Sequence, residues 1–226
     1  MSAPIVTTFE AEQAFNNPNN MWKALGGFIV SAPITAAVPA AFTTGATADL
    51  RQLDPAIFTR LGLVTKGDGV TFGRDMNQED EESWGYTENT RTDITQDVTS
   101  AQFTLQEVKR PVLEMYDFVD LSAVTPDPVT GEVAYNKPVF VAPQYRRLIF
   151  VGVDGAGTDR RYKIKIMPRG QVTGVDDESW GSTAATRFPF TITAKVDPVL
   201  GYAVRNVLAG PGQKARNASQ GFGPAS

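Results

Sequence analysis

The sequence predicts a mainly β protein: a two-sheet antiparallel β-sandwich or barrel with one flanking helix and an extended N-terminal arm. Several runs alternate apolar and polar residues, as strands do when one face is buried and the other is solvated. The 20 glycines and 15 prolines among 226 residues favour a turn-rich β fold over a helix bundle. We assign the arm to residues 1–48, the β domain to residues 49–210 and a flexible, polar tail to residues 211–226.

The arm contains an uncharged stretch, residues 24–48, which is long enough to cross a membrane. Pro33 and Pro39 argue against a membrane span, because they would leave backbone groups unsatisfied in lipid. We interpret the stretch as an edge strand or an extended segment packed on protein. The N-terminus lacks a basic segment followed by an apolar run, so no signal peptide is expected.

The start of the β domain predicts a short helix followed by a strand. Asp54 is a suitable N-cap and Pro55 a suitable first helical residue, and Gly62 is positioned to end the helix. Residues 66–74 combine glycines with apolar residues, which indicates a turn that enters a strand.

Residues 93–108 form the next predicted β segment. Their alternation changes phase between Val98 and Ala101, which predicts either a β-bulge or two strands. Residues 110–119 then show a helical apolar stripe, and Pro111 is suited to the first turn. The turn-rich residues 125–137 are predicted to form a loop.

The last third of the chain predicts a hairpin and a half-buried strand. Residues 145–153 and 160–167 are rich in β-branched and aromatic residues and are joined by the turn segment DGAGTD. Residues 188–196 alternate strictly between apolar and other side chains. Residues 198–208 have apolar spacing that suits a helix started by Asp197-Pro198, although a strand would also accommodate several of them.

One loop sequence occurs twice. ESWGYTENTR (82–91) and ESWGSTAATR (178–187) share seven of ten positions, and each has acidic residues before it and a strand after it. A PVL segment follows each copy, at residues 111–113 and 198–200. The repeat indicates either two similar hairpins or a pseudo-symmetric β-sandwich whose halves each supply a strand pair.

The composition argues against an enzyme. The chain has no histidine and no cysteine, so it lacks the usual activating base for a nucleophile and the commonest metal ligands. The acidic loops supply carboxylates that could form a catalytic pair or a calcium site, but acids beside turns are usually solvated and the EF-hand spacing is absent. The glycines at 152, 155 and 157 precede a strand, which indicates a hairpin turn and not a dinucleotide site. No cofactor or metal is expected.

Exposed charge and tryptophan give the candidate binding residues. The two acidic loops could dock on a basic strand face formed by every second residue from 161 to 165, although such a face could also be a solvated edge. The tryptophans could be interface anchors, or could pack their own loops on the sandwich. The net charge of −4 does not favour tight nucleic-acid binding. The candidate subunit-interface residues are Trp84, Trp180, Glu81, Glu82, Asp177, Glu178, Arg161, Lys163 and Lys165.

Several stretches together resemble the major tail protein of long-tailed phages of actinobacteria. They are ESWGYTENTRTDITQDVTSAQFTLQE, EMYDFVDLS, RRYKIKIMPRGQVT and FPFTITAKVDPVLGYAVRNVLAGPG, and the likeness covers residues 20–212. The resemblance implies a tail-tube β-sandwich whose subunits form rings, usually of six, that stack into a hollow tube.

The same resemblance implies the partners and the place of action. The partners would be further copies of the chain, the tape-measure protein, and the tail terminator and tail-tip proteins, with transient passage of DNA and no membrane. The protein would be assembled in the host cytoplasm and reside in the virion tail. A bacterial secretion-tube protein of similar plan is the alternative.

Overall fold

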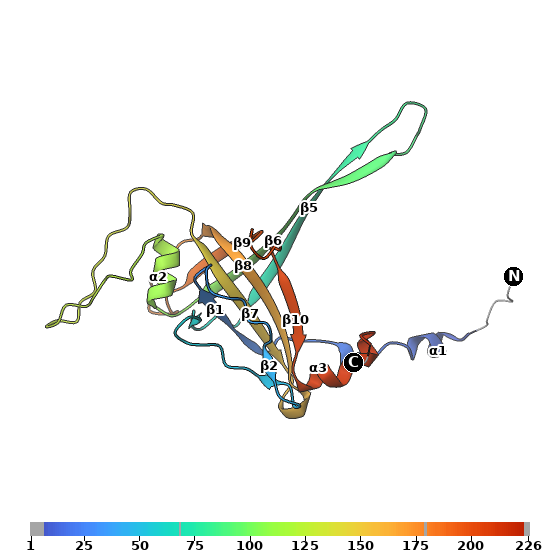
Figure 1. The fold of residues 1–226 in the computed structure, drawn as a ribbon, viewed down its shortest axis with the longest axis horizontal. Coiled ribbons are helices and arrows are strands. Elements are labelled where there is room, and N and C mark those ends of the chain that lie inside the picture. Colours follow the sequence, from blue (N-terminus) through green and yellow to red (C-terminus); the bar gives the residue numbers. More distant parts are fainter. Residues whose placement is uncertain (1–6, 68, 179, 224–226) are drawn as a thin grey trace.

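A computed structural model describes residues 7–67, 69–178 and 180–223, and one large antiparallel sheet dominates it (Figure 1). The strand order is β4-β1-β7-β8-β9-β6-β5, and β10 pairs with β8 off this path. A small second sheet joins β2 to β3. The strands are β1 Gly26–Ala32, β2 Thr43–Thr44, β3 Asp49–Leu50, β4 Thr59–Arg60, β5 Val70–Glu81, β6 Arg91–Leu105, β7 Tyr145–Asp154, β8 Arg161–Val175, β9 Phe188–Lys195 and β10 Arg205–Ala209. The α-helices are α1 Phe9–Gln13, α2 Arg110–Asp117 and α3 Pro211–Arg216.

The large sheet curls on itself. Three strands separate β5 from β7 in the sheet, so a flat sheet would hold them about 19 Å apart at about 4.8 Å per spacing. Yet the rings of Phe72 on β5 and Phe150 on β7 have centroids 5.2 Å apart and meet edge to face. Phe103 of β6 also meets Phe150, at 5.7 Å. The predicted mainly β, antiparallel fold is thus confirmed. Both layers of the sandwich belong to one sheet, which bends so that its two wings face each other.

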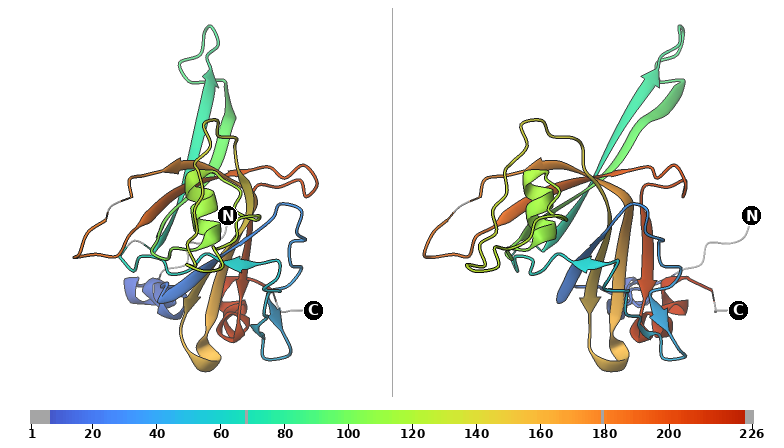
Figure 2. Two further views of the ribbon diagram at one scale, coloured as in Figure 1. Left: turned by 90° about the vertical axis from the view of Figure 1, so that its left-hand side faces the viewer. Right: turned by 60° about the vertical axis from the view of Figure 1, so that its left-hand side comes forward.

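The interior of the curl holds the main hydrophobic core. Side chains from both wings of the sheet, among them Leu148 on β7 and Phe190 on β9, lie in one buried cluster. Helix α2 closes the cluster with Val112 and Met115, both fully buried. Figure 2 shows α2 beside β9 and β6. The predicted flanking helix at residues 110–119 is therefore confirmed.

A second cluster covers the outer face of β1, β7 and β8. Val30, Ile149 and Ile164 are buried there against Phe42 and partly buried apolar side chains from residues 38–58. This corrects the expected arm: β1 is an integral strand of the large sheet and pairs along its length with β7. Among the described strands, the two-residue β4 alone pairs with its other edge. Residues 29–32 of β1 are buried, as expected for a strand segment covered on both faces, whereas most of the remaining residues of the uncharged stretch are exposed.

Strand β8 is central, and the sheet branches along it. Its first half pairs with β7 on one edge and β10 on the other, and its second half pairs with β9. The interpretation of residues 161–165 as a solvated sheet edge is therefore wrong. The strand β6 is continuous, which removes the predicted break between Val98 and Ala101. The irregularity in the pairing of β5 with β6 instead lies at Thr95. Asn77 pairs with Gln96 and Gln78 pairs with Ile94, so Thr95 has no partner residue on β5.

Two predicted helices are absent. At Asp54 the side chain accepts the Ala56 N–H at 2.9 Å and forms a turn, after which the chain enters β4. The carboxylate of Asp197 likewise accepts the N–H groups of Val199 and Leu200, and β10 follows. Short carboxylate turns outcompete helix formation at both places because strand pairing takes up the residues that follow.

The hairpin of β7 and β8 and the alternation of β9 agree with prediction. Strand β9 buries Phe188, Phe190, Ile192 and Ala194 and leaves the intervening residues half-buried. The C-terminal segment differs from the expected flexible tail, because residues 211–216 form α3 and its Gln213 is buried.

Candidate subunit-interface surfaces

The outer part of the β5–β6 hairpin projects from the body as a two-stranded ribbon (Figures 1 and 2). Strand β6 pairs with β9 from Ser100 to Leu105, so among the described strands residues 74–99 pair only within the hairpin. We call residues 74–99 the projecting ribbon. Most of its side chains are exposed, including Met76 at 39% and Ile94 at 61%. A lone two-stranded hairpin is at best marginally stable in water, so this element is suited to gain a partner surface.

Polar contacts across the projecting ribbon fix its register. Arg74 donates two hydrogen bonds to Asp97, at 2.8 and 2.7 Å, and Thr92 donates to Asp80 at 2.6 Å. The hydrogen bonds from Arg74 hold the pKa of Asp97 below its ordinary value. These groups are solvent-exposed, so the contacts orient the ribbon more than they stabilise it.

The first acidic loop forms the tip of the projecting ribbon. Thr90 closes the turn through its N–H to the Glu81 carbonyl at 2.8 Å, and its hydroxyl hydrogen-bonds with that of Ser83 at 2.8 Å. The Trp84 side chain is fully exposed, and Glu81 and Glu82 are exposed beside it. Trp84 therefore does not pack its own loop against the sandwich.

The second acidic loop lies on a different side of the molecule. It joins β8 to β9 and is tied to α2 by the Tyr116 hydroxyl, which donates to the Asp176 carbonyl at 2.7 Å. Trp180 is 84% exposed and donates to Glu178 at 2.7 Å. Asp177 is also exposed. Figure 2 shows this loop well apart from the ribbon tip, so the structure does not bring the two loops together.

The two loops are alike in topology, since each connects antiparallel strands. The PVL segments after them differ: residues 111–113 lie in α2, whereas residues 198–200 form a turn. The structure thus shows two similar hairpins in different surroundings.

The predicted basic residues share one face of β8 but have three environments. Arg161 is buried and pairs with Asp154. Lys165 lies over the Phe72 ring at 4.2 Å, and burial followed by repulsion from Lys163 lowers its pKa. Lys163 is exposed, with its ammonium 5.5 Å from the Trp22 ring. Lys163 is therefore the member of this face that is available to another subunit.

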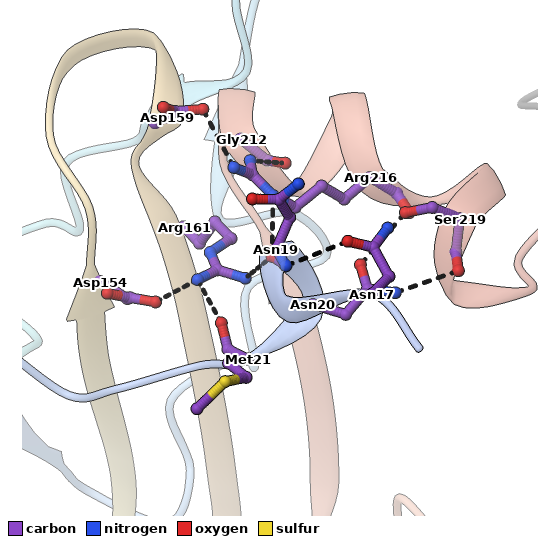
Figure 3. A network of polar contacts seen from close by, with 10 residues as sticks. All are labelled: Asn17, Asn19, Asn20, Met21, Asp154, Asp159, Arg161, Gly212, Arg216 and Ser219. Carbon is purple, nitrogen blue, oxygen red and sulfur yellow. Dashed lines mark hydrogen bonds and ion pairs between the residues drawn. The ribbon is translucent and has the colours of Figure 1, made fainter. Parts of the chain in front are cut away.

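Arg161 belongs to a polar network that holds the N-terminal segment (Figure 3). Its guanidinium donates to the Asn19 and Met21 carbonyls at 3.2 and 2.6 Å. Arg216 of α3 donates to the same Asn19 carbonyl at 3.1 Å and to Asp159 at 3.2 Å. We call these contacts the clasp.

Sequence reasoning missed the clasp. Its donors and acceptors come from positions far apart in the chain, and Arg216 lay in the segment assigned to a flexible tail. The available signal was Gly210-Pro211 at the start of the segment, a pair typical of a helix start. Asn20 and Ser219 complete the clasp through hydrogen bonds of 3.1 Å in each direction.

A second exposed surface was also missed. The long connection from α2 to β7 carries an apolar run in which Val139 and Phe140 are about nine-tenths exposed. The base of the connection is held by the Tyr135 hydroxyl, which donates to Asp117 at 2.9 Å. Burial, together with this hydrogen bond, raises the pKa of Tyr135 to about 12.

Across residues 7–67, 69–178 and 180–223, none of the helices has the length and apolar character needed to cross a membrane. Comparison with curated proteins found no match. The sequence does match the family described as phage tail tube protein over residues 14–198, a span that contains the projecting ribbon, both acidic loops and α2. The mainly β, antiparallel architecture is consistent with that family. The chain belongs to the phage tail tube protein family, which is structural and not enzymatic.

Proposed function

We propose that copies of this chain polymerise as stacked hexameric rings into a phage tail tube. The tube encloses the tape-measure protein and later forms the conduit through which DNA is ejected. Tail terminator and tail-tip proteins bind its two ends, and assembly takes place in the host cytoplasm. Family membership supports self-assembly in the virion tail. The sequence resemblance supports phages of actinobacteria as the source.

The projecting ribbon is the observation that carries the proposal. Among the described strands, the outer edge of β5 has no partner, and neither has the outer edge of β6 over residues 91–99. Open edges with free backbone groups are sites where another chain adds strands. A ribbon that docks on a different surface of the next copy makes a head-to-tail contact, which closes into a ring when the rotation closes.

The candidate interface residues give the contacts between copies a chemistry. Trp84 at the ribbon tip and Trp180 in the second loop are exposed aromatic anchors. The acids beside them, Glu81, Glu82, Asp177 and Glu178, face solvent and are complementary to Lys163 on a neighbouring copy. Such pairing fixes register more than it adds affinity. In this scheme Arg161 and Lys165 support the basic face from within their own subunit.

The low net charge is compatible with a conduit for DNA. At −4 the chain does not present the general excess of positive charge that binds phosphates tightly. Weak attraction to the lumen wall would let DNA pass without retention.

Electron microscopy of the purified chain tests the proposal. The wild-type protein is expected to form rings and tubes. A variant that replaces residues 78–95 with Asn-Gly, so that the turn joins the paired residues Asn77 and Gln96, is expected to remain folded, because that part of the ribbon lies outside the core, but to form neither. Trp84→Ala tests the tip alone, and Val129→Ser is a control at an exposed site on another loop. A wild-type chain that stays monomeric, or a ribbon deletion that still polymerises, would contradict the proposal.

A further inference from the structure

The described start of the chain is an acidic, aromatic arm that contacts little of its own subunit. Every residue from 7 to 19 is exposed, and Phe9 and Phe15 are 74% and 83% exposed. Between them lie Glu10 and Glu12, and the segment contains no lysine or arginine. Figure 1 shows α1 beyond the body of the molecule, on the side where α3 lies. Two exposed phenyl rings so close in sequence indicate a surface awaiting a partner.

The arm has a defined local structure before it meets that partner. Thr8 caps α1 through its hydroxyl, which accepts the Ala11 N–H at 3.2 Å. The clasp fixes the chain at Asn19 and Met21. Less conformational entropy is therefore lost when the arm docks, because its helix and its attachment point are already in place.

A recess on the opposite face of β7 has the complementary chemistry. It has a volume of about 360 Å³, and its walls are apolar apart from two arginines and a glutamine. The Arg60 guanidinium lies 3.3 Å over the Phe28 ring. Among the described residues, no carboxylate lies within 4 Å of Arg51 or Arg60. The lining residues are Phe28, Phe42, Leu50, Arg51, Gln52, Leu53, Arg60 and Val151.

The two features match in size and charge. An apolar cavity of about 150 Å³ holds benzene, so the recess has room for a phenylalanine ring. Glu10 and Glu12 supply the two negative charges that Arg51 and Arg60 lack. Among the described residues, neither glutamate has a cation within ion-pair distance.

The occupant is assigned to another copy because the arm and the recess lie on opposite faces of the sheet. Val151 lines the recess, whereas the next residue, Gly152, faces Trp22: a Cβ there would lie 2.8 Å from the indole. Successive side chains of a strand point to opposite faces. The chain therefore leaves the clasp on the side away from its own recess.

We propose that residues 8–15 of one subunit dock in the Arg51/Arg60 recess of a neighbouring subunit. A phenylalanine enters the recess, and the glutamates pair with the arginines at its rim. This inference rests on the proposed self-assembly and specifies one contact within it. The contact differs from the ribbon contact, since it uses another part of the chain and another face.

Engineered cysteines test the contact cleanly, because the natural chain has none. Full-length Ala14→Cys and Gln52→Cys chains are mixed under assembly conditions and oxidised. We expect disulfide-linked pairs of one chain of each kind. A mixture of Ala14→Cys with Val129→Cys, at an exposed site on the connection from α2 to β7, is the matched control and should give roughly tenfold less.

Charge-reversal variants test whether the arm is held by pairing between its glutamates and the arginines of the recess. Arg51→Glu with Arg60→Glu in the Gln52→Cys chain should reduce cross-linking roughly tenfold, and Glu10→Lys with Glu12→Lys in the partner chain should restore it. Phe15→Ala with Phe9→Ala should also reduce it. Efficient cross-linking that ignores all these changes would overturn the proposal.

The remaining outcomes separate this inference from the proposed function. Tubes that form without the cross-link would refute arm docking and leave the tube function intact. A chain carrying both cysteines that links only within itself would show that the arm occupies its own recess, which also refutes exchange between copies. A cross-link in small oligomers, with no rings or tubes by microscopy, would support the arm contact and refute the tube function.

Discussion

The Asp154 carboxylate and the Arg161 guanidinium pair directly across β7 and β8, and both side chains are buried at the turn of this hairpin. The same guanidinium holds two carbonyls of the N-terminal segment. One ion pair thus joins the central hairpin to the segment from which the arm emerges. A residue that the sequence marked as part of a docking face is instead an internal connector.

Arg161→Met is expected to lower the free energy of unfolding by about 3 kcal/mol, because it leaves Asp154 buried without its partner. Arg160→Met, at the exposed neighbouring position, should change it by less than about 0.5 kcal/mol. Urea unfolding followed by tryptophan fluorescence measures both. Hydrogen exchange should also show faster exchange near Met21 in the Arg161 variant alone. Equal stability of the two variants would show that the pair contributes nothing.

Acid is expected to weaken the fold through Asp154 and Asp197. Burial by itself raises the pKa of each carboxyl, but N–H donors and the partners Arg161 and Arg147 outweigh burial and hold both pKa values below the ordinary range. A depressed pKa contributes stability that is complete above the unfolded value of about 3.9 and is lost as the pH falls through the folded value.

The urea midpoint should therefore decrease below about pH 4 in the wild-type chain. Asp197→Asn should reduce this pH dependence, whereas the exposed Asp177→Asn should leave it unchanged. An identical pH dependence in all three proteins would contradict the assignment.

Phe190→Ala is expected to cost about 3–5 kcal/mol of stability. The ring lies in the main core, 5.7 Å from Phe103 and 6.1 Å from Tyr116 between centroids. The half-buried Thr191→Ala should cost less than about 1 kcal/mol. The two residues are neighbours on β9, and their side chains point to opposite faces of the sheet. Thermal or urea unfolding of the two variants therefore tests which face of β9 is buried. Similar losses for both would mean that the burial of β9 is misassigned.

Lys163→Glu is expected to leave the monomer folded and to slow tube growth several-fold, because it places an acid where the acidic loops of a neighbour would dock. Lys195→Glu, also an exposed lysine and on β9, makes the same charge change away from this face. Light scattering at low and moderate salt measures growth, and Glu81→Lys with Glu82→Lys should restore part of the rate. Growth that is equally slow in both lysine variants would point to net charge, and not to this contact.

The sequence by itself determined the elements whose signals are local. The alternation of β9, the hairpin of β7 and β8 and the apolar stripe of α2 each depend on residues close together in the chain, and the structure has them at the predicted places. The same local logic failed at Asp54 and Asp197, because helix-capping residues also form carboxylate turns and strand pairing with distant residues decided between the two outcomes.

Only the tertiary structure decided which surfaces are available for binding. The curl that brings Phe72 to Phe150 joins strands that are remote in the sheet, and the clasp joins the two ends of the chain. Arg161 and Lys163 both belong to the series of basic residues at every second position of β8, yet Arg161 is buried and Lys163 is exposed. Burial depends on what packs across each residue from elsewhere in the chain, and that information is absent from the residue's own sequence neighbourhood.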